Sequence, residues 1–476
     1  MRYSILLLIF SFLFTVGCDS FLDDNPDDRQ EIKTVEDVAE LVASAYHQAT
    51  FLFVEWMTDN VGPIENNAQK EYMTEAYLWD PIDSYESQES STFFWEQAYY
   101  AIAHTNEGLS VIDKVEGDDN LRKAIKGEAL IARAYSHFLL VNVFAKHYNL
   151  KTSNNDLGIP YSDEVEDELF KKYTRLSVQE VYDLIERDIK DGLKLLSDDY
   201  FAGSKKYHFT REAAYAFAAR FYLFKQEYDK SKFYCDKILG SGSANPAYVR
   251  DLNQIYQGTS FSSMASKFSS PDELSNILLI RKESFYARAN YGYRSDADKF
   301  IEIFSNNIQK EFDNRDQRWN LGTYAVFSPK YDELFQYTTS NTGYPYFIQT
   351  ELRGEEVILN RMECMIMEGN YTKALDDYHV LAEKRYESGG ILVLDSIKKF
   401  YSKEDAKEAM ISFLIDERRK EFLDEGLRWF DIKRFTLSVQ HTTLNGESFH
   451  LAANDNKTAV QIPQKAITNG ITPNPR

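Results

Sequence analysis

A run of mixed charges and bulky aromatic residues near the C-terminus, Glu417–Phe435 (ERRKEFLDEGLRWFDIKRF), constrains the fold more than any other feature of the chain. Read with the residues before it, the run continues a stripe at helical steps of four and three, made of Ile411, Ile415, Arg418, Phe422, Glu425 and Trp429. Two positions of this otherwise apolar stripe are charged. Because a buried charge needs an opposite charge or hydrogen bonds, Arg418 and Glu425 must have partners. They form either a catalytic pair or a structural lock.

Helical periodicity extends over most of the chain. Amphipathic segments begin at Val35 (continuing to Met57), at Thr92, and after the short break Gly117–Asp119. Further helices are expected at Ser177–Leu196, Arg211–Lys225, Tyr228–Leu239, Gly354–Glu368, Tyr371–Tyr386 and Lys403–Glu425. The chain is therefore predicted to be mainly α.

Several of these helices come in pairs that match the tetratricopeptide pattern of large and small residues. In the pair around Ser231, the patterned positions are occupied by Tyr215, Ala218, Ala219, Tyr222 and Cys235. The pair around Ala374 fits less well, because Arg361 and Met365 depart from the pattern. The repeats are degenerate and lack a strict 34-residue step, so we expect tetratricopeptide-like helices with long ordered loops packed on them rather than a pure solenoid.

Long interruptions separate the helices near residues 56–85, 149–172 and 240–345. Loops of this length in a compact protein are usually functional or disordered, and their aromatic content favours ordered, functional loops. The last residues, 436–476, end in a proline-containing segment that is expected to be non-helical and strapped to the body.

The N-terminus reads as a secretory signal. Residues 1–17 carry one early cation, Arg2, and an apolar run too short to span a bilayer permanently. Cys18 directly follows small residues, as in a bacterial lipobox, although Thr15 stands where leucine is usual. We expect Cys18 to carry a lipid, residues 18–34 to form a flexible tether, and residues 35–476 to fold as a single domain.

Composition narrows the class of function. The formal net charge of −21 argues against a nucleic-acid partner and against electrostatic docking on anionic lipid. The three cysteines are too few for a disulfide scaffold, and no histidine or cysteine spacing suggests a metal site. No hydrolase, metalloprotease or nucleotide-binding motif is present, so we expect neither a catalytic site nor a cofactor.

The order of motifs resembles that of the SusD/RagB family of outer-membrane nutrient-binding lipoproteins. The Glu417–Arg434 string matches the family hallmark, and GEALIARAYSHFLL, TRLSVQEVYDLIERDIKDGLKLL and VILNRMECMIMEGNYTKALDDYHVLAEKR match its helices. The resemblance covers essentially the whole mature chain. It implies a protein anchored through its lipid in the outer membrane, facing the cell exterior, that captures a glycan or a peptide for a SusC-type TonB-dependent transporter.

The resemblance also indicates which residues are structural. The hallmark recurs in relatives that bind different ligands, so we assign structural ion pairs, not ligand choice or catalysis, to Arg418, Glu421, Glu425 and Arg428.

Ligand contacts in relatives come from loops before the first repeat pair and from the long middle insertion. Aromatic faces stack on sugar C–H surfaces, while amides and carboxylates bind hydroxyl groups. Two stretches, residues 56–85 and 286–324, have this composition. Their candidate residues are Asp59, Asn60, Tyr77, Trp79, Asp80, Tyr291, Tyr293, Arg294, Trp319 and Tyr324. For Arg315 and Arg318, an ion-pair cluster with Asp313 and Asp316 is the alternative.

Two other classes of function stay open at the level of the residues. A surface glycoside hydrolase needs only a pair of carboxylates, which 75 acidic residues supply by chance. A purely structural envelope protein is supported only by the repeats.

Overall fold

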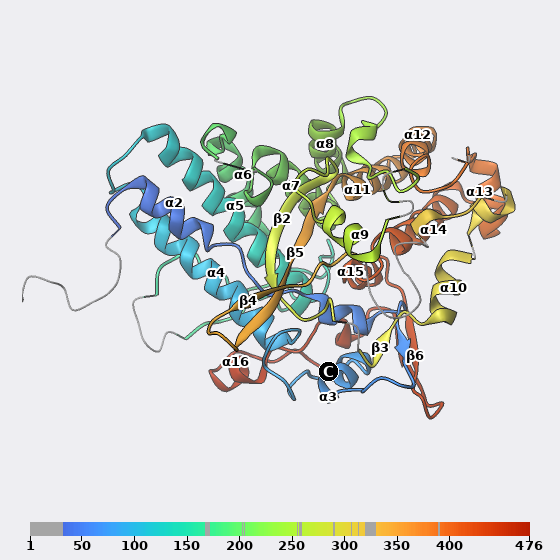
Figure 1. The fold of residues 1–476 in the computed structure, drawn as a ribbon, viewed down its shortest axis with the longest axis horizontal. Helices are drawn as coiled ribbons and strands as arrows, with labels where there is room; N and C mark the ends of the chain where they lie inside the picture. Colours follow the sequence, from blue (N-terminus) through green and yellow to red (C-terminus); the bar gives the residue numbers. More distant parts are fainter. Residues whose placement is uncertain are drawn as a thin grey trace, which may run out of the picture.

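The computed structural model describes residues 32–166, 172–201, 203, 205–254, 256, 259–288, 291–305, 307–312, 314–318, 330–388 and 391–476. Helices dominate the described residues (Figure 1), which confirms the predicted fold class. The first half contains α2 (Val35–Ala43), α3 (Glu71–Tyr77), α4 (Ser91–Val111), α5 (Asp119–Phe144), α6 (Val178–Leu195), α7 (Arg211–Phe224) and α8 (Tyr228–Leu239). The second half contains α9 (Phe261–Phe268), α10 (Ala297–Ser305), α11 (Gly354–Met367), α12 (Tyr371–Ala382), α13 (Leu394–Tyr401), α14 (Ala406–Glu421), α15 (Leu427–Arg434) and α16 (Gln464–Thr468).

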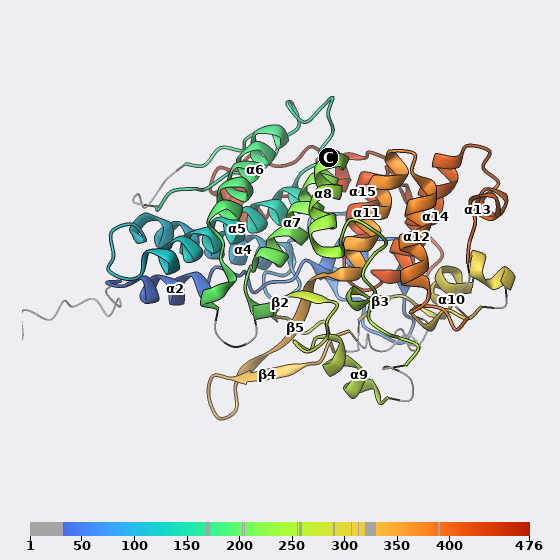
Figure 2. The same ribbon diagram turned by 90° about the horizontal axis from the view of Figure 1, so that it is seen from above.

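The long helices pack as a row of neighbours. Helix α4 packs on α5, α5 on α6, α7 on α8, and α11 on both α8 and α12, and Figure 2 shows these helices side by side. Glycines permit the closest approach in the row. A Cβ atom on Gly127 of α5 would lie 2.8 Å from the backbone nitrogen of Leu196 and 3.0 Å from the carbonyl oxygen of Gly192. Any larger side chain would push α6 away.

Polar side chains fix where the helices begin. Ser177 caps α6 in a capping box, in which its hydroxyl accepts from Glu180 N and the Glu180 carboxylate accepts from the Ser177 backbone nitrogen. Asp118, Thr210 and Asp405 accept hydrogen bonds from the first backbone amides of α5, α7 and α14. These caps explain why the predicted starts of several helices agree with the structure.

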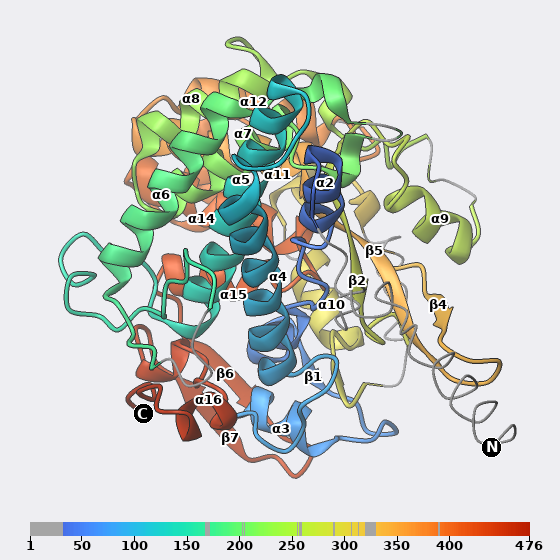
Figure 3. The same ribbon diagram turned by 90° about the vertical axis from the view of Figure 1, so that its left-hand side faces the viewer.

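Three small antiparallel sheets lie within the interruptions of the helical body. The largest has the order β2 (Asn276–Glu283), β5 (Gly343–Arg353), β4 (Leu334–Tyr337), and β4 forms its free edge. Two-stranded sheets join β1 (Gly62–Pro63) to β3 (Tyr293–Arg294) and β6 (Val439–Thr442) to β7 (Ser448–Leu451). Figure 3 shows β6, β7, α3 and α16 gathered at one end of the molecule. The predicted loops near 56–85 and 240–345 thus contain short ordered elements.

Two predicted helices are shorter than the periodicity suggested. The segment Val35–Met57 is helical only as far as Ala43, and its last part, Leu52–Met57, is a 3-10 helix whose residues are all buried. The segment Lys403–Glu425 is interrupted, because α14 ends at Glu421 and α15 begins at Leu427. Gly426 between them adopts a positive φ of 72°, which an α-helix does not allow. Trp429 therefore lies on α15 and does not continue the stripe of α14.

The C-terminal segment packs on the body, as expected, but it contains a short helix that the sequence did not predict. The prolines were expected to preclude helix, yet α16 begins directly after Pro463, which occupies the N-cap position where no backbone amide is needed. The strap itself is held by Asn474, whose amide donates to the carbonyl oxygens of Phe144 (2.8 Å) and Val460 (2.7 Å).

The described residues contain two small clusters of buried apolar residues and one large hydrophobic core, which runs through the helical row. Cys235 and Cys364 are free and buried within it. Within the part of the chain that the structure describes, no helix is both long and apolar enough to cross a bilayer.

Candidate functional site

The two stretches singled out for ligand contact lie against each other. Gly62 and Pro63 of β1 pair with Arg294 and Tyr293 of β3, and the Asn67 side-chain amide donates to the Tyr291 carbonyl oxygen at 2.7 Å. The approach requires a glycine at position 292, because a Cβ atom there would lie 2.6 Å from the Ala68 carbonyl oxygen. The structure therefore joins residues that are more than 200 positions apart in the sequence into one loop cluster, defined here as residues 56–85 and 286–294.

Three of the candidate aromatic rings take part in one continuous stack. Trp79 stacks on His441 with ring centroids 4.5 Å apart, His441 on Tyr77 at 3.9 Å, and Tyr77 on Tyr293 at 4.2 Å. The Trp79 indole also donates to the Met57 carbonyl oxygen at 2.9 Å, and the Tyr77 hydroxyl donates to the Thr442 carbonyl oxygen at 3.0 Å. We name Trp79, His441, Tyr77 and Tyr293 the ring stack.

His441 is the member of the ring stack that the sequence reasoning missed. It lies on β6, and its two ring nitrogens lie 2.6 Å and 2.8 Å from the carbonyl oxygens of Tyr77 and Thr58. Burial lowers the pKa of its imidazole to about 4, although the two carbonyl contacts act in the opposite direction. No signal in the C-terminal segment points to this position, because an isolated histidine between polar residues resembles any surface strand.

The candidate rings are buried in this structure. The exposed fractions are 1% for Tyr77, 2% for Trp79, 3% for Tyr291 and 4% for Tyr293. A ring whose faces are covered by other rings cannot stack on a sugar, so direct stacking on these side chains does not occur in this conformation. The aromatic composition of these loops was interpreted as an open binding surface, whereas in the structure the rings pack against one another. Their part in ligand binding stays a prediction.

The polar candidates are mostly engaged with neighbouring charges. Asp59 accepts two hydrogen bonds of 2.8 Å from Arg428, and Asn60 accepts one of 2.9 Å from Arg419. Although burial acts in the opposite direction, the Arg428 guanidinium holds the pKa of the Asp59 carboxyl well below its usual range. Asp80 is exposed and forms an ion pair of 3.1 Å with Lys457. It is the candidate most accessible to a ligand.

Of the three remaining candidates, Arg294 lies in the described part of the chain. The Arg294 guanidinium lies 5.9 Å from the ring centroid of Tyr291 and is largely buried. Trp319 and Tyr324 lie outside the described residues, as does Asp313. Arg318 forms a buried ion pair of 2.7 Å with Asp316, which agrees with the structural alternative for this arginine.

The hallmark residues form a lattice of buried ion pairs. Arg418 pairs with Asp431 at 2.8 Å, Glu421 with Arg385 at 2.8 Å, Glu425 with Arg353 at 2.7 Å, and Arg428 with Asp59 at 2.8 Å. Arg318 adds contacts to Glu417 at 2.9 Å and to Glu421 at 3.5 Å. We name this set the ion-pair lattice. Every charge has a partner on another element, so the lattice ties α14 and α15 to β5 and to the loop cluster.

Open aromatic surface occurs elsewhere, on the β4–β5 hairpin. Phe335 and Tyr337 are 39% and 68% exposed, and their ring centroids lie 4.8 Å apart. On β5, the half-buried rings of Tyr344 and Tyr346 lie 5.6 Å and 4.3 Å from the Arg281 guanidinium. Figure 2 shows that this hairpin projects from the body. Among the described residues, no group of three or more His, Cys, Asp or Glu side chains is arranged to hold a metal ion.

Comparison with known families gives two matches that together span most of the chain. Residues 20–223 match the family model described as "Starch-binding associating with outer membrane", of the SusD-like type. Residues 303–469 match the model described as "SusD family". The second match includes the entire Glu417–Phe435 run.

Relatives and solved structures agree with these matches. SusD-like protein P38 of Formosa agariphila is 23% identical over 92% of this chain and 93% of its own length, and SusD-like protein P2 of the same organism is 21% identical over 74% of this chain and 73% of its own length. A SusD superfamily protein from Bacteroides thetaiotaomicron superposes with a TM-score of 0.68 at 18% identity, covering 93% of this chain and all of that chain. A SusD-like carbohydrate binding protein from Bacteroides vulgatus superposes with a TM-score of 0.67 at 16% identity, covering 92% and 96%.

The helical row with its inserted sheets, the ion-pair lattice built from the Glu417–Arg434 string, and both family matches lead to one conclusion. This chain belongs to the SusD family.

Proposed function

We propose that this protein is a cell-surface lipoprotein that captures an oligosaccharide or polysaccharide and delivers it to a SusC-type TonB-dependent transporter of the outer membrane. Membership of the SusD family carries this proposal. The printed description of the Bacteroides vulgatus protein as carbohydrate binding supports the choice of a glycan. The alternative ligand, a peptide, would use the same scaffold.

The ligand site proposed here is the surface over the loop cluster. The ring stack and Tyr291 would form its rigid foundation, with Asp59, Asn60, Asp80, Arg294, Trp319 and Tyr324 as the further candidates. Rigid support matters because a site held by packed rings loses little conformational entropy when a ligand binds. Asp80 is free to accept hydroxyl hydrogen bonds after exchanging its ion pair with Lys457.

The proposed location follows from the N-terminal segment. Cys18 would carry the lipid, and residues 18–34 would link it to the folded body. The net charge of −21 disfavours adsorption of the body on an anionic leaflet, so contact with the membrane would depend on the lipid alone.

Binding without catalysis distinguishes this proposal from a glycoside hydrolase. The carboxylates of the lattice are each paired with an arginine. Two carboxyl groups near the loop cluster have a raised pKa, Glu55 (to about 7) and Glu89 (to about 8), but both are buried, so neither faces a ligand in this structure. A hydrolase needs one carboxylic acid with a raised pKa beside the ligand.

Affinity electrophoresis in gels containing starch, xylan, galactan or pectin tests the proposal, with reducing ends assayed in parallel. We expect retardation by at least one polysaccharide and no new reducing ends. New reducing ends would favour the hydrolase. Absence of retardation by every polysaccharide, together with saturable binding of a peptide mixture, would favour the peptide alternative.

A further inference from the structure

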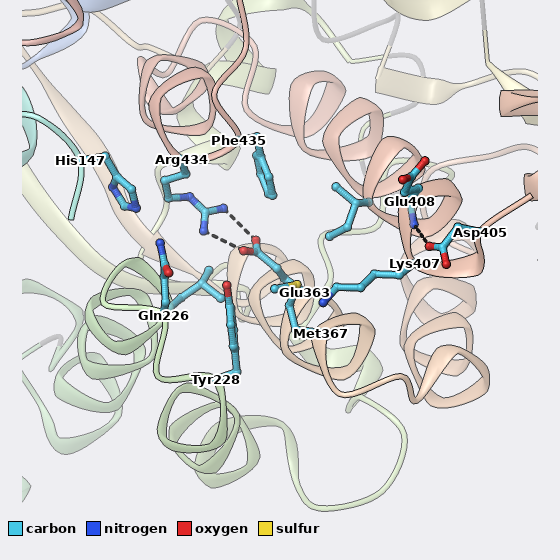
Figure 4. A pocket seen from close by; sticks show the side chains of 12 residues that line it. His147, Gln226, Tyr228, Glu363, Met367, Asp405, Lys407, Glu408, Arg434 and Phe435 are labelled. Carbon is cyan, nitrogen blue, oxygen red and sulfur yellow. Dashed lines mark hydrogen bonds and ion pairs between the residues drawn. The ribbon is translucent and has the colours of Figure 1, made fainter. Parts of the chain in front are cut away.

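A cavity with a mixed polar and apolar lining opens on the helical side of the molecule, and none of its lining residues belongs to the loop cluster. Its volume is about 530 Å³, and it is lined by residues of α7, α8, α11, α14 and α15 and by the segment that follows α5. Figure 4 shows the side chains of Tyr228, Glu363, Lys407 and Arg434 around it. Sites for small molecules are usually about 300–1,000 Å³, so one or two sugar residues fit this volume.

The floor of the cavity is rigid and electrically neutral. Both terminal nitrogens of Arg434 donate to the Glu363 carboxylate at 2.8 Å, and both side chains are at least 96% buried, with exposed fractions of 4% and 3%. The guanidinium also lies between the rings of Phe224 and Phe435, 4.9 Å and 4.8 Å from their centroids. A bidentate pair clamped between two rings is fixed before a ligand arrives, and its carboxylate oxygens retain lone pairs that can accept hydroxyl hydrogen bonds.

The walls carry polar groups that have no partner in the described part of the protein. The Lys407 ammonium group and the Tyr228 hydroxyl make no hydrogen bond or ion pair there, and both side chains are half-buried. Burial and the nearby Glu363 carboxylate raise the pKa of Tyr228 to about 12, so its hydroxyl stays protonated at pH 7. Burial and the charges of Arg434 and Lys433 hold the pKa of His147 well below its usual range, so this lining residue is neutral. The cavity therefore combines the paired side chains of Arg434 and Glu363 with two wall groups, the Lys407 ammonium and the Tyr228 hydroxyl, that are left to bind a ligand.

The charges at the cavity favour a neutral ligand. Asp405 and Glu408 at the start of α14 are exposed carboxylates that line it, and the whole chain carries a net charge of −21. An acidic ligand would meet repulsion from both sources, and Lys407 offers only one unpaired cation in return. A ligand with hydroxyl groups on its edge and C–H groups on its faces matches the mixture of polar groups and the Phe435 ring.

We propose that this cavity binds the end of a neutral oligosaccharide, one or two residues long, with Lys407 and Tyr228 donating to its hydroxyl groups and Glu363 accepting from them. The proposal rests on the proposed glycan-binding function and deepens it by adding a second sugar site.

Hydrogen–deuterium exchange of the full-length protein tests the proposal and separates the two sites. The probes are maltotriose, xylotriose, mannotriose and galactotriose as neutral sugars, and trigalacturonate as the acidic comparison. We expect at least one neutral trisaccharide to protect backbone amides in residues 223–229 and 403–411, and trigalacturonate to protect neither segment. Tyr228→Phe and Lys407→Met should each weaken the binding of that trisaccharide about fivefold to tenfold in calorimetry.

Lys399→Met provides the matched control, because Lys399 is an exposed lysine on the neighbouring helix α13 and does not line the cavity. It should leave the affinity unchanged. Protection confined to residues 56–85 and 286–294 would overturn the second site and leave the proposed function standing. Protection of the cavity segments that persists at the wild-type affinity in both variants would overturn the roles of Lys407 and Tyr228. Protection by none of the neutral sugars, while the polysaccharide gels show retardation, would also overturn the second site alone.

Discussion

Individual charges in this protein are satisfied over long sequence distances. Arg418 donates to Asp431 on α15 and to the Asn360 side chain on α11 at 2.9 Å. The cost of removing such a charge from water is recovered only when every partner is in place. The ion pairs of the hallmark string therefore tie α14 and α15 to β5 and to the loop cluster.

Replacement of Arg418 by alanine should destabilise the protein strongly. The change leaves the buried Asp431 carboxylate with one partner fewer, and breaking a buried pair costs about 3–5 kcal/mol. Urea denaturation followed by circular dichroism measures the free energy of unfolding. Lys403→Ala is the control, because Lys403 forms an exposed pair with Glu408 at 3.5 Å and should cost less than about 1 kcal/mol. Equal small losses in both variants would contradict the structural role.

A buried carboxyl group beneath the loop cluster should make stability depend on pH. Burial raises the pKa of Glu89 to about 8, and its carboxyl contacts the Ser284 hydroxyl and the Phe285 backbone nitrogen. The folded state therefore binds this proton more tightly than the unfolded state, whose pKa is near 4.5. Stability from this group is complete below about pH 4.5 and is lost as the pH rises towards 8, at up to about 1.4 kcal/mol per pH unit.

Glu89→Gln removes this titration while keeping the shape of the side chain. The glutamine amide can donate to Ser284, and its oxygen can accept from Phe285. We expect the free energy of unfolding to fall less between pH 5 and pH 8.5 than in the wild type, and the variant to be the more stable protein at pH 8.5. Parallel pH profiles for the two proteins would show that Glu89 is ionised in the folded state.

The sequence predicted that Arg418 and Glu425 have ion-pair partners, but not which residues these partners are. The positions of Arg418 and Glu425 on an apolar helical stripe predicted that both are paired, because burying an unpaired charge is too costly. Their partners, Asp431 and Arg353, could not be found, since both come from other elements whose packing the periodicity does not encode. The aromatic candidates lie in two loops that meet in the structure. Composition does not distinguish rings that bind a ligand from rings that stack on one another, as Tyr77 does.

At the scale of elements, the break between α14 and α15 gives the hallmark string its shape. Asp424 and Gly426 have φ angles of 64° and 72°. The Gly426 backbone nitrogen donates to the Glu55 carboxylate at 2.8 Å, and burial raises the pKa of Glu55 to about 7. The periodicity alone predicted a continuous helix here, because a tertiary contact to a residue nearly 400 positions away decides the turn.

Gly426→Ala should therefore disturb the break for two reasons. A left-handed backbone conformation costs an alanine about 1–2 kcal/mol, and the new Cβ atom would lie 2.9 Å from the Phe51 ring, which adds about 1–3 kcal/mol of overlap. Gly369→Ala is the matched control, with a φ of 81° and open space around the glycine. We expect the first variant to lose clearly more stability in thermal unfolding than the second. Similar losses of stability in the two variants would mean that the overlap with the Phe51 ring does not contribute to the effect.

At the scale of the whole molecule, a helical row carries loops and a projecting hairpin, and the sequence predicted the helical row well. The paired helices were visible because amphipathic periodicity and N-cap residues such as Ser177 and Asp118 are local signals. The sheet of β2, β5 and β4 was not predicted, because its strands lie in segments that read as loops and meet only after folding.

Cys18→Ala tests the proposed anchor. Each buried methylene group of an acyl chain contributes about 0.8 kcal/mol, so a protein with several chains stays on the membrane. The variant should leave the membrane fraction or accumulate as the unprocessed precursor, while its circular dichroism spectrum stays unchanged. A variant that still fractionates with the outer membrane and carries lipid would show that the anchor lies elsewhere.

The central claim is that this SusD-family chain captures glycans for an outer-membrane transporter. The most direct measurement is affinity purification of the tagged, full-length protein from membranes solubilised in mild detergent, with the co-purified proteins identified by mass spectrometry. The account predicts that a large TonB-dependent β-barrel protein is recovered with it in a fixed ratio, and that the complex retains a labelled oligosaccharide. Recovery of the tagged protein alone under these conditions would contradict this proposal.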